Sequence, residues 1–178
     1  HISFIFSICV SSIFFFYADE LSLAIYQNLE SAKWIKILAP IVIFMYVDNI
    51  VDGILKGLNE QVAVMCCNII DLIVTITIIF FLVPKIGLMG FVISIIVSEI
   101  LNFTISCIQL KKRINYVIPI FSSIILPIIV SLFAYFITSL FKISFSSIVI
   151  GLIFNITIFI VVFLIIVSGL NILLKNSG

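Results

Sequence analysis

The chain has 178 residues, of which 64% are apolar and 10% are charged, and its formal net charge is +1. Soluble domains are about 45–50% apolar and about 25% charged, so this composition predicts an integral membrane protein, as does the mean hydropathy of +1.47. It excludes a nucleotide-binding fold and a disulfide-stabilised secreted domain, and the near-neutral charge indicates no nucleic-acid partner. The first residue is His1 rather than methionine, so we expect the protein to extend further upstream.

Six apolar runs have the length and composition of membrane-spanning helices, although the first is slightly short. A spanning helix needs about 20 largely apolar residues, and the runs lie at 2–17, 35–55, 62–83, 90–110, 116–140 and 148–170. In hydrocarbon only helices or closed barrels satisfy the backbone, and these runs lack the alternation of a barrel. The sequence therefore predicts an all-α membrane protein, a polytopic bundle of about six transmembrane helices.

The segment between the first two runs predicts a short helix at the membrane surface. Residues 18–34 carry several charges, and apolar residues recur there at helical spacing. We expect Asp19 to cap this helix and Trp34 to anchor it among the lipid headgroups. Tight turns are predicted at 57–61 and 84–87, and Pro127 should kink the fifth run.

Positively charged residues predict the orientation of the bundle, because short cytoplasmic loops are enriched in Lys and Arg. Lys111, Lys112 and Arg113 form a cluster in one short loop, and Lys56 and Lys175 fall on the same side of the predicted membrane. The opposite side would carry the scattered lysines Lys33, Lys36, Lys85 and Lys142. We therefore place the basic cluster and both ends of the chain in the cytoplasm, and the protein in the cytoplasmic membrane.

Four carboxylates fall inside the predicted spans, where a charge at the bilayer centre costs at least about 2.5–3.5 kcal/mol. They are Asp48, Asp52, Asp71 and Glu99. Helical spacing puts each carboxylate on a polar face of its helix. The three faces consist of Asp48, Asp52, Lys56 and Asn59 in the second run, Asn68, Asp71 and Thr75 in the third, and Glu99, Asn102 and Ser106 in the fourth. Three consecutive helices are therefore each expected to turn a polar face away from lipid.

Two interpretations of these carboxylates remain open. Asp52 has a basic partner one turn away and is predicted to form a structural ion pair with Lys56. Asp48 and Glu99 have no such partner, so they either line a polar or proton-binding cavity or make hydrogen bonds between helices. Asp71, in the middle third of its span, is the sharpest candidate for a protonatable site.

No other pattern in the sequence carries chemistry. The four cysteines lie in apolar runs without metal-binding spacing, so we interpret them as small apolar side chains and expect no metal site. The single histidine is at the chain end, and the aspartates lack the glycine pattern of an intramembrane protease. We expect neither an enzyme nor a cofactor.

Several motifs resemble the C-terminal half of a known transporter family. They lie at 17–22, 38–40, 46–61, 68–71, 84–90 and 98–103, and include the run Asp-x-x-x-Asp-Gly-Ile-Leu-x-Gly at 48–57. They resemble the sporulation branch of the polysaccharide flippases, in the superfamily that also holds the MATE multidrug exporters and the lipid II flippases. The resemblance covers residues 17–113; the last two helices resemble the family in hydropathy only.

The resemblance implies a two-lobe transporter, of which residues 1–178 supply most or all of the C-terminal transmembrane lobe. Its partners would be membrane lipids, a lipid-linked sugar substrate and the N-terminal lobe of the same protein, and the process served would be spore cortex or cell-wall synthesis. Candidate transport or proton sites are Asp48, Asn68, Asp71, Glu99 and Asn102. The alternatives are a cation-coupled MATE-type exporter and a membrane scaffold that transports nothing. Lipid II flippases use a cavity arginine cluster, which this chain lacks, because its one arginine is Arg113.

Overall fold

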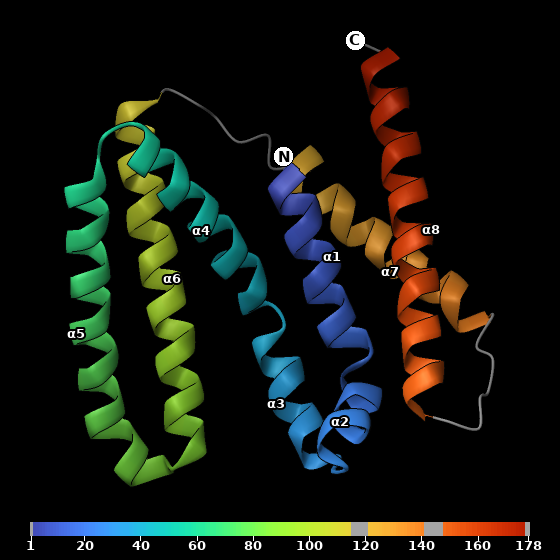
Figure 1. Cartoon of the computed structure of the whole chain (residues 1–178), viewed down its shortest axis with the longest axis horizontal. Helices are drawn as coiled ribbons and strands as arrows, with labels where there is room; N and C mark the ends of the chain where they lie inside the picture. Colours follow the sequence, from blue (N-terminus) through green and yellow to red (C-terminus); the bar gives the residue numbers. More distant parts are fainter. Residues whose placement is uncertain (1, 115–120, 141–147, 177–178) are drawn as a thin grey trace. The chain divides into compact units, whose positions relative to one another are not determined.

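The computed structural model describes residues 2–114, 121–140 and 148–176, and this part of the chain is helical with no strand (Figure 1). The prediction of an all-α bundle is confirmed. The α-helices are α1 (Ile2–Phe16), α2 (Ala18–Tyr26), α3 (Glu30–Leu38), α4 (Ile41–Gly57), α5 (Gln61–Ile86), α6 (Leu88–Arg113), α7 (Leu126–Leu140) and α8 (Ile148–Asn176). A short π-helix, η1 (Phe121–Ile125), precedes α7.

Four described segments are long and apolar enough to cross a membrane, namely Gln61–Ile86, Leu88–Arg113, Ser123–Leu140 and Ile148–Leu170. The number rises to six if α1 with α2, and α3 with α4, each count as one broken span. The run predicted at 2–17 ends as a helix at Phe16, and α2 continues from it at an angle of 71°.

The span predicted at 35–55 is not one continuous helix. It is interrupted between Leu38, where α3 ends, and Ile41, where α4 begins. The cause is Pro40 at the N-cap of α4, because proline lacks the backbone N–H that would continue the hydrogen-bond ladder of α3. The expectation of an unbroken second helix was therefore wrong.

The segment between α1 and α4 forms two helices where one surface helix was predicted. Asp19 lies in the first turn of α2 but caps nothing with its side chain, since the N-cap position is Tyr17. The carboxylate of Asp19 instead forms an ion pair with Lys36 of α3, in which Lys36 Nζ lies 2.7 Å from Asp19 Oδ2. An exposed ion pair therefore links α2 to α3, and the cap predicted for Asp19 does not form.

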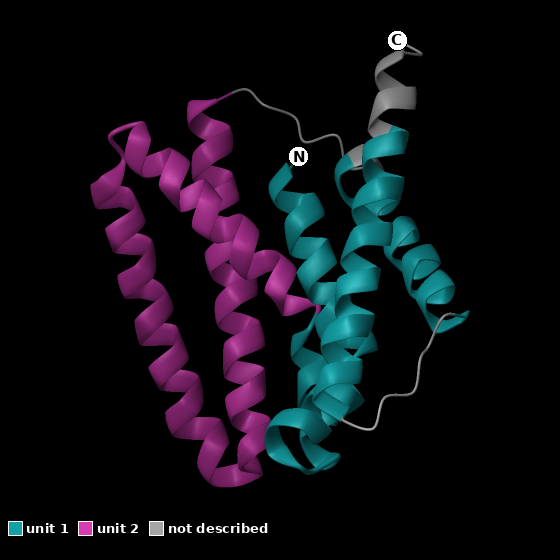
Figure 2. Cartoon of the chain, turned by 45° about the vertical axis from the view of Figure 1, so that its right-hand side comes forward, with its two compact units in different colours: residues 1–39, 119–178 teal, residues 40–118 magenta. Residues whose placement is uncertain are grey.

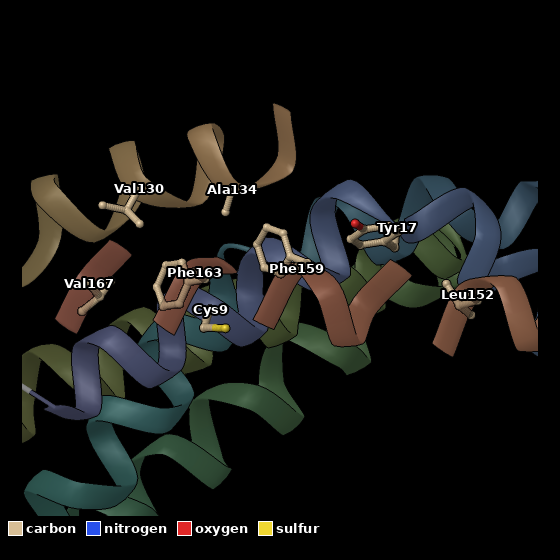
Figure 3. Packing of buried hydrophobic residues seen from close by; sticks show 8 residues of the cluster. All are labelled: Cys9, Tyr17, Val130, Ala134, Leu152, Phe159, Phe163 and Val167. Carbon is tan, nitrogen blue, oxygen red and sulfur yellow. The ribbon is translucent and has the colours of Figure 1, made fainter. Parts of the chain in front are cut away.

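The chain divides into two compact units, coloured separately in Figure 2: residues 1–39 with 119–178, and residues 40–118. The first unit has an apolar core of side chains from α1, α7 and α8 (Figure 3). Phe159 and Phe163 are fully buried there, one turn apart on α8, and the ring of Tyr135 stacks on that of Phe16 with centroids 4.3 Å apart. Burial along α8 at a spacing of three or four residues makes one apolar stripe.

The predicted kink near Pro127 corresponds to a change of helix type. Residues 121–125 form the π-helix, and α7 begins immediately before Pro127, which is fully buried. Proline cannot donate to the preceding turn, and a π-helical turn is one way in which a helix accommodates such a defect. The sequence also predicts a break near 141–146, between the runs at 116–140 and 148–170, and it lies outside the described residues.

The second unit consists of α4, α5 and α6, with α5 and α6 joined as a tight hairpin at Gly87 (Figure 1). Gly87 has φ = 59°, a backbone conformation that side chains disfavour. A Cβ built on Gly90 would lie 2.8 Å from the backbone carbon of Leu82, so glycine is needed for the close approach of the two helices. The predicted turn at 84–87 is therefore displaced, because α5 continues through Pro84 to Ile86.

Candidate functional site: a polar seam in the α4–α6 unit

One face of α6 carries a continuous row of hydrogen-bond donors. We call it the α6 polar row, and it comprises Ser98, Asn102, Ser106, Gln109 and Arg113. The spacings of four, four, three and four residues place these side chains along one side of the helix. The helix as a whole is nevertheless apolar enough to span a membrane.

Each member of the α6 polar row donates to a side chain of the helices packed against α6. Toward α4, Asn102 Nδ2 lies 2.8 Å from Asp48 Oδ2, and Ser106 Oγ lies 3.2 Å from Asp52 Oδ1. Toward α5, the pairs are Ser98 Oγ with Asp71 Oδ1 at 2.6 Å, Gln109 Nε2 with Cys67 Sγ at 2.8 Å, and the ion pair between Arg113 and Glu60. The donors thus come from α6 and the acceptors from α4 and α5, which makes a polar seam through the unit.

The pair formed by Asp48 and Asn102 is not fully satisfied. Asp48 is 6% exposed, and among the described residues neither its Oδ1 atom nor Oδ1 of Asn102 has a hydrogen-bond partner. Both atoms are acceptors when the acid is ionised, so the pair is short of one donor hydrogen. A proton carried by Asp48 would supply that donor, and the pair therefore has the chemistry of a protonatable site as well as of a helix contact.

The other candidate residues differ in their surroundings. Asp71 and Glu99 are half-buried, and Asn68 is exposed on α5. Glu99 makes no hydrogen bond or ion pair within the described part of the chain, although it lies close enough to Asp48 and Asp71 to interact with them electrostatically. The structure therefore brings Asp48, Asp71, Glu99 and Asn102 into one region, whereas Asn68 stays outside the hydrogen-bonded seam.

The predicted ion pair between Asp52 and Lys56 does not form. Asp52 faces α6 and accepts from Ser106, while Lys56 is exposed at the end of α4. Glu60, a second potential partner of Lys56, is paired with Arg113. The reason is that α6 offers Asp52 a hydrogen-bond donor that is fixed in place, whereas an exposed lysine gains little from pairing.

Three members of the α6 polar row were not predicted from the sequence, namely Ser98, Gln109 and Arg113. Their signal was present, because polar residues recur on α6 every three or four positions from Ser94 onward. Cys67, interpreted as an apolar side chain, is buried and accepts from Gln109, whereas its neighbour Cys66 is exposed on another face of α5. All four cysteines are free thiols.

A cavity of about 350 Å³ opens at the basic end of this unit. Its lining comes from the adjoining ends of α4, α5 and α6, and consists of Leu55, Glu60, Ala63, Gln109, Lys112 and Arg113. Two of these residues are cationic and one is anionic. Basic side chains at the cytoplasmic end of membrane helices attract anionic lipid headgroups. Neither Asp48, Asp71 nor Glu99 lines this cavity.

Fold and site together define a class: a multi-pass α-helical membrane protein with a polar seam between three of its helices. Among the described residues no group of histidine, cysteine and carboxylate side chains is arranged to hold a metal ion. A curated relative, stage V sporulation protein B of Bacillus subtilis, is 32% identical to this chain over 91 residues. The match covers 50% of this chain and 18% of that protein, so the chain spans well under two thirds of its relative.

Two further comparisons found no counterpart. No family model matches the chain. No solved structure matches it significantly either. The similarity to the sporulation protein is therefore a local one, over half of the chain.

Proposed function

We propose that this chain is the C-terminal part of a flippase-type transporter, which moves lipid-linked oligosaccharide or polysaccharide precursors across the cytoplasmic membrane. The observation that carries the proposal is the similarity to stage V sporulation protein B, together with the flippase-like motifs at 46–61 and 84–90. Four to six candidate spans support it, because a transporter lobe is built from such helices. The substrate class and the link to spore cortex or wall synthesis rest on the resemblance.

The polar seam and the basic cavity fit this function in different ways. A seam of carboxylates within apolar helices offers a place where a proton could bias the packing of α4 against α6. The cavity between Lys112, Arg113 and Glu60 is suited to the phosphate of a lipid headgroup, since its cations outnumber its anion. Both features would serve a protein that accepts an anionic lipid at one face of the membrane.

A scaffold without transport activity is the second candidate, and one observation favours it. Asp48, Asp52 and Asp71 each accept a hydrogen bond from α6, so they can be explained as contacts that hold helices together. The cation-coupled exporter remains a third candidate through Glu99, whose carboxylate has no such contact within the described residues. The phenotype of a deletion strain distinguishes the flippase, the scaffold and the exporter.

The test is deletion of the full-length gene in the organism that carries it. We expect deletion to impair the synthesis of a spore-cortex or envelope polysaccharide, measured as the muropeptide and saccharide content of purified spores and walls. Re-expression of the full-length protein should restore the content, and an unrelated multi-pass protein should not. Normal polysaccharide with increased drug sensitivity would contradict the flippase and support the exporter.

A further inference from the structure

The contact between α4 and α6 at Asp48 and Asn102 lacks one hydrogen. Asp48 is 6% exposed, and its Oδ2 atom accepts from Asn102 Nδ2 at 2.8 Å. The Oδ1 atom of each side chain is buried as well, and neither has a hydrogen-bond partner among the described residues. Buried polar atoms are rarely left unpaired in native proteins. One hydrogen shared between these two oxygens would satisfy both at once.

The hydroxyl group of Ser106 does not supply this hydrogen. Ser106 lies near Asp48 on the next turn of α6, but its Oγ atom donates to Asp52 Oδ1 at 3.2 Å. A hydroxyl has a single hydrogen to donate. Turned toward Asp48, it would leave both Asp52 and the amide oxygen of Asn102 without a donor.

The ionisable side chains that interact with Asp48 are acids from all three helices of the unit. They are Asp52 on α4, Cys67 and Asp71 on α5, and Glu99 and Cys107 on α6. The basic side chains of α4, α5 and α6 all lie in the last turn of their helices and are exposed there. A negative charge on Asp48 would therefore be repelled by every one of these acids that is ionised.

We propose that Asp48 is a protonated, neutral acid that forms a closed acid–amide pair with Asn102. In this pair Asn102 Nδ2 donates to Asp48 Oδ2, and the acid hydroxyl at Asp48 Oδ1 donates back to Asn102 Oδ1. The terminal torsions of Asp and Asn have broad minima, so a small rotation closes the second hydrogen bond. Each side chain then donates once and accepts once, and neither atom is left over.

The closed pair gives Asp48 the role of a positioning residue. A neutral pair avoids the cost of a charge within apolar helices, and its two hydrogen bonds fix the register of α4 against α6. The contact between Ser106 and Asp52 lies one turn further along both helices and depends on the same register. This role goes beyond the proposed transport function and requires no particular substrate.

Infrared spectroscopy of the purified full-length protein at pH 7 tests the protonation directly. Labelling the aspartate carboxyl groups with ¹³C separates their bands from those of Glu99 and other glutamates. We expect wild type to show the carbonyl band of a protonated aspartic acid, and Asp48→Asn to lose it. Asp19→Asn is the matched control and should keep the band, because Asp19 is exposed and paired with Lys36 in the other unit.

The pH dependence of thermal unfolding provides a second readout. An aspartate in the unfolded chain is ionised above about pH 5, so unfolding would release the proton that native Asp48 holds. The unfolding equilibrium constant then rises up to about tenfold per pH unit through this group, and the midpoint falls as pH rises. Asp48→Asn should release one proton fewer between pH 6 and 8 yet remain folded, because its amide can donate to Asn102 Oδ1. Asp19→Asn should release as many protons as wild type.

Three results would overturn the proposal. Wild type without a protonated aspartic acid band at pH 7 would show that Asp48 is ionised and that water satisfies the two oxygens. A band that survives in Asp48→Asn but disappears in Asp52→Asn or Asp71→Asn would assign the proton to that other acid. Equal proton release by wild type and Asp48→Asn would contradict the closed pair as well. None of these measurements involves transport, so their failure leaves the flippase proposal to its own test.

Discussion

The contact between Asp48 and Asn102 shows how this protein offsets part of the free-energy cost of placing a carboxylate inside the membrane. An interhelical hydrogen bond in a membrane contributes about 0.6 kcal/mol on average, which is less than the cost of inserting a charge there. The bond of 2.8 Å between the two side chains therefore lowers this cost without removing it. A partly satisfied acid of this kind is expected to matter both for packing and for any protonation that accompanies transport.

Replacing Asn102 tests how much Asp48 depends on its partner. In Asn102→Leu a buried acid loses its donor, so we expect the free energy of unfolding to fall by about 1–3 kcal/mol. Ser106→Ala removes the longer bond to Asp52 and should cost only about 0.6 kcal/mol. Reversible unfolding in mixed detergent measures both changes.

Thr104→Val provides the control for these variants on α6. Thr104 is exposed, and its hydroxyl donates to the Ile100 carbonyl of its own helix, so its loss should change stability by less than about 0.5 kcal/mol. Equal effects of Asn102→Leu and Thr104→Val would contradict the importance assigned to the Asp48 contact.

The α5–α6 hairpin shows how the elements of this unit come together. The two helices approach closely where Gly90 meets the backbone of Leu82 and Val83, with distances of 2.8–2.9 Å from a built Cβ. This approach brings Ser98 of α6 within reach of Asp71 of α5 further along the hairpin. The geometry of the polar seam therefore depends on a glycine that lies outside it.

Gly90→Ala tests this dependence. The added methyl group meets backbone atoms that cannot rotate away, so the helices must separate, and we expect a loss of about 1–3 kcal/mol in unfolding free energy. Gly53→Ala on α4 is the matched control, because nothing lies within 4 Å of its Cβ position. Alanine is the better helix former, so this control should be neutral or stabilising. The hairpin account fails if Gly90→Ala is as stable as Gly53→Ala.

Sequence predicted the helices of this protein well, and their breaks and contacts less well. Long apolar runs that lack the alternation of a barrel can cross a membrane only as helices, which is why α5, α6 and α8 follow directly from hydropathy. The partners of Asp48 and Asp52 did not follow, because they lie 54 residues away on α6. For Asp52, local spacing favours Lys56 instead, and for Asp48 it offers no partner at all. Pro40 is a sequence signal for the break between α3 and α4. The apolar residues on both sides of it nevertheless favoured one continuous span.

At the scale of the whole molecule, the basic cluster at the end of α6 predicts the orientation in the membrane, with this end in the cytoplasm. In a background without native cysteines, Ile114→Cys should react with a membrane-impermeant thiol reagent only from the cytoplasmic side. Ile114 is exposed directly after Arg113, so the reagent has access to it. Labelling in intact cells and in inverted vesicles measures the two sides separately.

Lys85→Cys gives the opposite expectation within the same hairpin. Lys85 is exposed near the turn at Gly87, one crossing away from Ile114 along α6, and should react from outside. Labelling of Ile114→Cys from outside and of Lys85→Cys from inside would reverse the predicted topology.

The most direct measurement of the central claim is flipping of a fluorescent lipid-linked oligosaccharide by the full-length protein in proteoliposomes. The account predicts transport well above protein-free vesicles for wild type and for Thr77→Val, whose exposed hydroxyl bonds only to Ile73 of its own helix. Asp71→Asn keeps an acceptor for Ser98 but cannot exchange a proton, so it should fold and fail to transport. Full transport by Asp71→Asn would make that carboxylate structural, and folded wild-type protein that moves no lipid would contradict the flippase itself.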